Sequence, residues 1–198
     1  MKKVYTLSLF LLVISISPCW AETYEQWVSN CRSYKDVAEW LNENFLCDGT
    51  ETHAGVTGGQ NHGKGLKAKS GEETFRSKTG GSLEAALFAV ETLNRINRDY
   101  RARIIHLLPE KSPAHYVCGF YLGGKLFILD YGTRHEKMIG THGPFKDLDE
   151  YVRKFYLKNH PLPHRLQSYN FGWPGSAPPK QHPPAPKPFP TPVCITPP

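Results

Sequence analysis

Apolar residues recur at helical spacing in three stretches of the chain. In the longest, from Ser82 to about Ile96, apolar side chains cover so much of the circumference that we expect a buried helix. The apolar positions are Leu83, Ala85, Ala86, Leu87, Phe88, Ala89, Val90 and Leu93. Residues 33–45 and 147–158 each begin with a Ser or Asp that can cap a helix and then place apolar residues on one face. These two segments predict further helices.

Three shorter apolar runs follow the central helix, at residues 102–108, 115–122 and 125–130. Their length and their content of β-branched and aromatic residues predict β-strands. Only Gly123-Gly124 separates the last two runs, and a pair of glycines between two strands is a strong signal for a two-residue hairpin loop.

The predicted hairpin places two polar side chains on one face of the sheet. With a two-residue loop, Leu122 lies opposite Lys125, and each outward step pairs one residue from either strand. His115 and Asp130 then share a face, one diagonal step apart, at a separation of about 7–8 Å that longer side chains can bridge. A carboxylate at this position would fix the tautomer and orientation of the imidazole, as in a catalytic base and its orienting group.

Ser82 opens the central helix directly after two glycines. Backbone N–H groups at a helix start can form an oxyanion hole, and a serine hydroxyl there needs a well-aligned base to act as a nucleophile. The structural alternative is that Ser82 caps its own helix, since serine is a preferred N-cap. His115 could likewise be a hydrogen-bonded histidine at a strand start, and Asp130 a turn residue. Taken together, the three residues predict a Ser-His-Asp site.

The segments around these residues resemble the transglutaminase-like superfamily of cysteine peptidases, in its exported bacterial form. Residues 70–89 are similar to the family's nucleophile segment, and residues 115–132 to its His strand, hairpin and Asp strand. The resemblance extends over about residues 33–156. It implies an α+β, papain-like core in which the nucleophile helix packs on an antiparallel sheet. It also implies acyl transfer on amides, by hydrolysis or by cross-linking of glutamine to amines.

By this resemblance His115 is the base and Asp130 the orienting group, whereas Ser82 stands where the family has a cysteine. Gly81 also replaces the acidic residue that often precedes the nucleophile. Three interpretations follow: a weakly active or non-catalytic domain that binds a peptide or an envelope partner, an active amide hydrolase or acyltransferase that uses Ser82, or a cysteine enzyme inactivated by a Cys-to-Ser change. We favour the first, because serine gains less than a thiol from a helix start.

The ends of the chain predict targeting and linker segments. Residues 1–21 begin with Met-Lys-Lys, continue as a short apolar run and end on a small residue, which is typical of a secretory signal peptide. We therefore expect an exported protein, periplasmic or secreted, without an integral membrane segment after cleavage. Residues 22–170 are expected to form one domain containing a Gly-rich loop at 49–71, and residues 171–198 a Pro-rich tail. We expect regular structure to end at residues 160–164.

The formal net charge is +6, without a dense Lys/Arg patch or a nucleic-acid-reading motif. The expected partner is therefore a peptide or protein, including components of the cell envelope, and not a nucleic acid. The histidines other than His115 lack ligand spacing, so we expect no metal and no cofactor.

Four cysteines remain after signal cleavage, Cys31, Cys47, Cys118 and Cys194, and an oxidising compartment allows them to pair. A bridge from Cys31 to Cys47 would need the helix between them to be short or bent, because bridged Cα atoms lie within roughly 7 Å. We expect Cys118 to point into the core, and we leave the pairing open.

Overall fold

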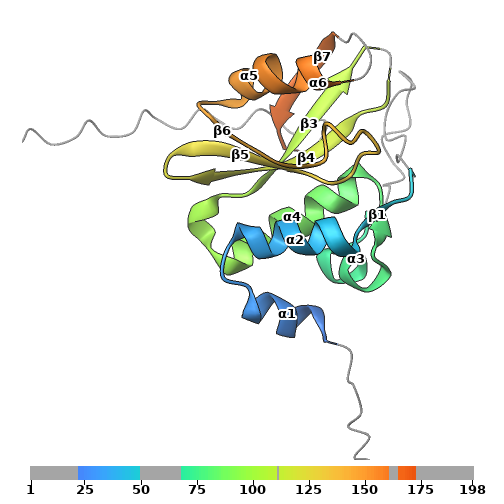
Figure 1. Ribbon diagram of the computed structural model, residues 1–198, viewed down its shortest axis with the longest axis vertical. Helices are drawn as coiled ribbons and strands as arrows, with labels where there is room; N and C mark the ends of the chain where they lie inside the picture. Colours follow the sequence, from blue (N-terminus) through green and yellow to red (C-terminus); the bar gives the residue numbers. More distant parts are fainter. Residues whose placement is uncertain (1–21, 50–67, 111, 161–164, 173–198) are drawn as a thin grey trace, which may run out of the picture.

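The computed structural model describes residues 22–49, 68–110, 112–160 and 165–172. Its centre is a five-stranded antiparallel sheet with the strand order β6-β5-β4-β3-β7. The strands are β3 (Arg103–Pro109), β4 (His115–Leu122), β5 (Lys125–Asp130), β6 (Gly140–Phe145) and β7 (Leu166–Phe171). Helices cover both faces of this sheet (Figure 1). This is the predicted α+β class, with the helix that begins at Ser82 packed on the sheet.

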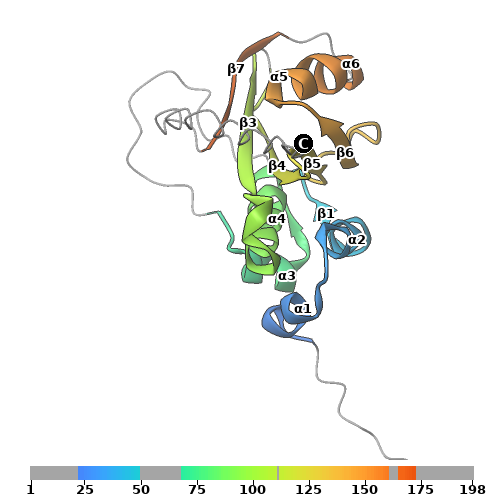
Figure 2. The ribbon, with the colours of Figure 1, turned by 90° about the vertical axis from the view of Figure 1, so that its left-hand side faces the viewer.

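One face of the sheet carries the N-terminal helices (Figures 1 and 2). These are α1 (Tyr24–Asn30), α2 (Tyr34–Asn44), α3 (Gly71–Ser77) and α4 (Ser82–Ile96), followed by the 3₁₀ turn η1 (Arg98–Tyr100). A short parallel pair, β1 (Leu46–Cys47) and β2 (Thr79–Gly80), joins the end of α2 to the segment before α4. The other face carries the continuous helical segment α5 (Leu148–Tyr151), η2 (Val152–Tyr156) and α6 (Leu157–Asn159).

Helix α4 is apolar around most of its circumference because it packs on β4 and also contacts the other N-terminal helices. Phe88 is fully buried, and its ring stacks on that of Trp40 with 4.4 Å between the centroids. On the sheet side, Leu93 belongs to the same core cluster as Cys118 and Phe120. Burial of one such side chain contributes about 1.5–3 kcal/mol, so this contact fixes α4 firmly on β4.

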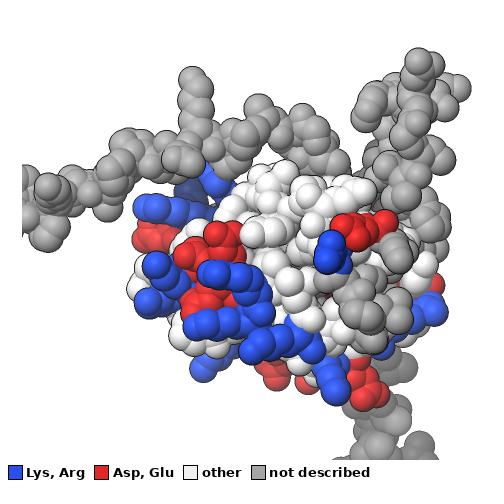
Figure 3. Space-filling view, turned by 90° about the horizontal axis from the view of Figure 1, so that it is seen from above, with Lys and Arg blue, Asp and Glu red and all other residues white. Residues whose placement is uncertain are grey.

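A second core lies on the opposite face of the sheet. Val117 and Ile128 pack there against Tyr151 and Tyr156 of the C-terminal helical segment. Asp147 caps this segment, because its Oδ1 accepts a hydrogen bond from the backbone N–H of Glu150 at 2.8 Å. Tyr151, the last residue of α5, and Tyr156, in the π-helical turn η2, are both fully buried. On this side of the molecule Lys/Arg and Asp/Glu side chains are interspersed, beside an area with few charges (Figure 3).

The elements with strong local patterns confirm the sequence predictions. The central helix spans Ser82–Ile96, and the hairpin strands His115–Leu122 and Lys125–Asp130 have the predicted bounds. Leu122 pairs with Lys125, as a two-residue loop requires. The strand expected at residues 102–108 is displaced by one residue, and the helices expected at 33–45 and 147–158 are present, the latter with the π-helical turn.

Other elements were not predicted. Helices α1 and α3 have only seven residues each, and both depend on a capping box for their start. Strand β6 contains Gly and Pro, and forms one edge of the sheet. The prediction that regular structure ends at residues 160–164 was wrong, because β7 follows and pairs with β3. The predicted signal peptide (1–21), most of the Gly-rich loop (50–67) and residues 173–198 of the tail lie outside the described residues.

Cys31 and Cys118 are thiols in the structure. Cys118 is a fully buried free thiol in the core, as predicted. Cys31 is a free thiol whose Sγ donates to the carbonyl oxygen of Trp27 at 3.3 Å, so it does not form the bridge to Cys47 that was considered. Burial, followed by the nearby negative charges of Asp36 and Glu22, raises the pKa of Cys31 to about 11.

Within the described ranges, no helix combines the length and the apolar character needed to cross a membrane.

Candidate functional site

Ser82 is the first residue of α4, directly after the N-cap Gly81. The backbone N–H of Gly81 donates to Oε2 of Glu84 at 3.0 Å, and this bond fixes the start of the helix. Gly80 is required here, because a Cβ at this position would stand 2.7 Å from Cβ of Glu84. The alternative in which Ser82 caps its own helix does not apply, since the N-cap is Gly81.

The hydroxyl of Ser82 joins α4 to the sheet instead. Its Oγ accepts a hydrogen bond from the backbone N–H of Tyr116 at 3.3 Å, and only 4% of the residue is exposed. Tyr116 directly follows His115 in β4. The structure therefore brings Ser82 to the backbone beside the predicted base.

His115 and Asp130 form the contact that the hairpin register predicts. Nε2 of His115 lies 2.8 Å from Oδ2 of Asp130, with 15% of the histidine side chain and none of the aspartate side chain exposed. A carboxylate that accepts a hydrogen bond from one ring nitrogen of a histidine fixes the tautomer and orientation of the imidazole. The pair thus has the geometry of a base and its orienting group.

The surroundings of the pair are aromatic. The ring of His115 stacks on that of Tyr156 in η2, with 6.3 Å between centroids and an interplanar angle of 20°. Tyr151 is fully buried nearby, and burial, then the negative charge of Asp130, raises its pKa well above its ordinary value of 10. Tyr151 is therefore a neutral phenol. Its hydroxyl and Oδ1 of Asp130 are among the buried polar atoms without a hydrogen-bond partner in the described part of the chain.

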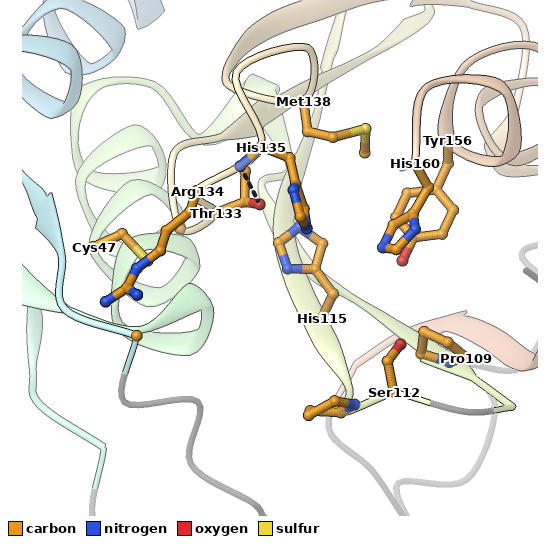
Figure 4. Close-up of a pocket in the computed structure, with 13 residues that line it drawn as sticks. Cys47, Pro109, Ser112, His115, Thr133, Arg134, His135, Met138, Tyr156 and His160 are labelled. Carbon is orange, nitrogen blue, oxygen red and sulfur yellow. Dashed lines mark hydrogen bonds between the residues drawn. The ribbon is translucent and has the colours of Figure 1, made fainter. Parts of the chain in front are cut away.

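A pocket of about 290 Å³ opens beside His115 (Figure 4). Its lining residues are Cys47, Gly49, Pro109, Ser112, Pro113, His115, Gly132, Thr133, Arg134, His135, Met138, Tyr156 and His160. Ser82 is not one of them, but Gly132, which packs against Ser82, is. The pocket therefore borders the imidazole, and Gly132 connects its lining to Ser82.

Sequence reasoning missed most of this pocket. Arg134 and His135 follow Asp130 closely, and a polar loop immediately after the Asp strand is the signal that could have drawn attention to them. Tyr156 and His160 come from the opposite layer, and only the tertiary fold brings them to His115. The described residues contain no group of three or more His, Cys, Asp or Glu side chains that could hold a metal ion.

The sequence matches no protein-family model and no curated protein. Among solved structures, calcium-bound LapG of Legionella pneumophila is similar to 54% of this chain, with 21% sequence identity and a TM-score of 0.35. The match covers 55% of LapG, so the chain spans about half the length of that protein. Because both identity and TM-score are low, the function proposed below depends on the side chains described above.

Proposed function

We propose that residues 22–170 form a transglutaminase-like domain that binds a peptide segment beside His115 and has weak or no acyl-transfer activity. The order of Ser82, His115 and Asp130 along the chain supports this proposal, as do their positions on a helix start, a strand start and a strand end. The base and its orienting group are in hydrogen-bonding contact, so the weak component of the site is the nucleophile.

The observation that carries the proposal is the environment of the Ser82 hydroxyl. Only 4% of Ser82 is exposed, and its Oγ already accepts a hydrogen bond from Tyr116 N–H. An oxygen that receives a hydrogen bond has reduced electron density for attack, and a hydroxyl is not ionised near neutral pH. A thiol at this helix start would be favoured as the thiolate, whereas serine gains little from the same environment.

The second candidate is an active amide hydrolase or acyltransferase that uses Ser82. The intact pair of His115 and Asp130 favours it. A fully buried carboxylate is costly unless it is paired, and Asp130 is paired with the imidazole that would act as the base. A cysteine enzyme inactivated by a Cys-to-Ser change would retain the same pair. The active serine enzyme and the inactivated cysteine enzyme would both retain the peptide-binding cleft. They differ only in the chemistry at position 82.

We also propose that the domain acts outside the cytoplasm, in the periplasm or after secretion, on a protein or peptide that includes cell-envelope components. The support is the signal-peptide pattern of residues 1–21 together with a cleft that has the size of a peptide side-chain site.

A fluorophosphonate probe applied to the mature protein separates the two candidates. We expect negligible labelling of Ser82 by mass spectrometry, together with peptide binding that survives in Ser82→Ala. Stoichiometric labelling at Ser82 that disappears in His115→Ala would contradict weak or absent catalysis and establish the serine enzyme.

A further inference from the structure

The pocket beside His115 is lined by basic side chains and by no acidic one among the described residues. None of the 13 residues that line it is Asp or Glu. Arg134, His135 and His160 all contribute nitrogen donors, and Ser112 adds a hydroxyl. Figure 4 shows Arg134 and His160 on opposite sides of His115 in this view. A ligand group in this space therefore meets donors from more than one direction.

Arg134 is held in place at this pocket. Its Nη2 donates to the carbonyl oxygen of Asp48 at 2.9 Å, which ties the loop after β5 to the segment after β1. This bond uses one of the five N–H donors of a guanidinium, and the others keep the planar fork geometry that matches a carboxylate. A charge that is already fixed loses less side-chain entropy when a ligand binds.

The two histidines are positioned by their neighbours. The backbone N–H of His135 donates to Oγ1 of Thr133 at 3.2 Å, which shapes the loop that carries its ring. The rings of His135 and His160 meet edge to face, with 5.5 Å between centroids and an interplanar angle of 64°. His160 also lies 5.5 Å from the ring of Tyr156, which in turn stacks on His115. These ring contacts connect the outer pocket wall to the predicted base.

We propose that this pocket binds the carboxylate side chain of an Asp or Glu in a peptide, and so determines which peptides are presented to His115. This inference rests on the proposed peptide-binding function and adds its specificity. Arg134 provides the charged, two-pronged contact that carboxylates favour, and His135 and His160 supply further donors. Among the described residues, none that lines the pocket is acidic, and the nearby carboxylate of Asp130 is already bonded to His115.

The competing explanation is that Arg134 only holds the carbonyl of Asp48. In that case Arg134→Gln lowers stability and weakens all peptides alike. Arg153 offers a matched control, since its guanidinium Nε also donates to a backbone carbonyl, that of Asp149 at 3.3 Å, and Arg153 does not line the pocket. Arg153→Gln lowers the net charge as much as Arg134→Gln does. It therefore shows whether an effect of Arg134→Gln comes from the contact in the pocket or from the change in net charge.

The test is fluorescence anisotropy of the mature protein with labelled random hexapeptide pools in which one position at a time is fixed as Glu, Gln or Lys. We expect Glu pools to bind about tenfold more tightly than Gln pools at one or two positions, as for a hydrogen-bonded charge. Arg134→Gln, and more weakly the exposed-site variant His135→Gln, should remove this preference, whereas Arg153→Gln should retain it. Melting temperatures verify that each variant is folded.

Two results would overturn the proposal, and they differ in meaning. If Glu and Gln pools bind equally, or if the Glu preference survives in both Arg134→Gln and His135→Gln, the carboxylate specificity is wrong while peptide binding stands. If no pool binds to the unmodified protein, the proposed peptide-binding function fails, and the specificity with it.

Discussion

Gly132 lies directly against Ser82. A Cβ on Gly132 would stand 2.3 Å from Cα of Ser82 and 3.0 Å from its backbone nitrogen. The chain just after Asp130 and the first residue of α4 are therefore held together by a contact that has no space for a side chain. This contact fixes the position of the helix start relative to the strand that carries Asp130.

Gly132→Ala should separate these two segments. The added methyl meets backbone atoms that cannot rotate away, so we expect the free energy of unfolding to fall by about 1–3 kcal/mol, as in other overpacked sites. Urea denaturation measures the loss. Gly123→Asn is the control, because that residue has φ +57° in open space, where asparagine is tolerated. An equal loss in both variants would show that the contact with Ser82 is unimportant.

Ser82→Ala should destabilise the fold even if Ser82 has no chemical role. The change removes the acceptor for Tyr116 N–H in a buried place, and an unpaired buried donor costs about 1–3 kcal/mol. Urea denaturation tests this, with Ser77→Ala as a control at an exposed serine. Unchanged stability in Ser82→Ala would contradict the structural hydrogen bond and weaken the case that it restrains the hydroxyl.

The pair of His115 and Asp130 should respond unequally to the removal of either partner. His115→Gln disturbs the bond to a fully buried carboxylate, and leaving such a charge unpaired costs about 3–5 kcal/mol. Asp130→Asn removes the charge itself, so its cost should be smaller. A double-mutant cycle on the free energy of unfolding measures the coupling, and additive losses would contradict a direct interaction.

His106 should make the domain less stable in mild acid. It is 6% exposed in β3, its ring stacks on Tyr116 at 5.2 Å, and burial lowers its pKa from the ordinary 6.5. Below pH 6.5 the unfolded chain binds a proton that the folded chain resists. The stability present above this pH is therefore lost as the pH falls towards the folded-state value, with a slope of at most about 1.4 kcal/mol per pH unit.

The variant His106→Phe keeps an aromatic ring and cannot titrate. Its free energy of unfolding, measured between pH 7.5 and 5, should show a shallower decline than that of the unmodified protein. The same decline in both proteins would assign the acid sensitivity to other groups.

The parts of the fold that the sequence predicted are those with local signals. The apolar circumference of α4 and the glycine pair between β4 and β5 each need only neighbouring residues to be recognised. The hairpin register then predicts the contact between His115 and Asp130, which forms at 2.8 Å. Local periodicity and turn chemistry were sufficient for this half of the site.

The remaining parts depend on long-range pairing. Strand β6 has weak strand propensity and is stabilised by pairing with β5, and β7 pairs with β3, about sixty residues earlier in the chain. The pocket is lined by Arg134, from the loop after β5, and by His160, from the end of α6. The hydrogen bond from Tyr116 N–H to Ser82 likewise joins residues that are 34 positions apart. No periodicity or short motif in the sequence indicates any of these contacts.

The measurement that tests the central claim most directly is the activity of the purified protein beside its Ser82→Cys variant. Casein hydrolysis and incorporation of a fluorescent amine into casein report the two acyl-transfer outcomes. Because the pair of His115 and Asp130 is assembled, we predict activity near background with Ser82 and a clear gain, of about tenfold or more, with cysteine. Strong activity of the unmodified protein that is lost in Ser82→Ala, or a folded Ser82→Cys protein with no gain, would contradict the account.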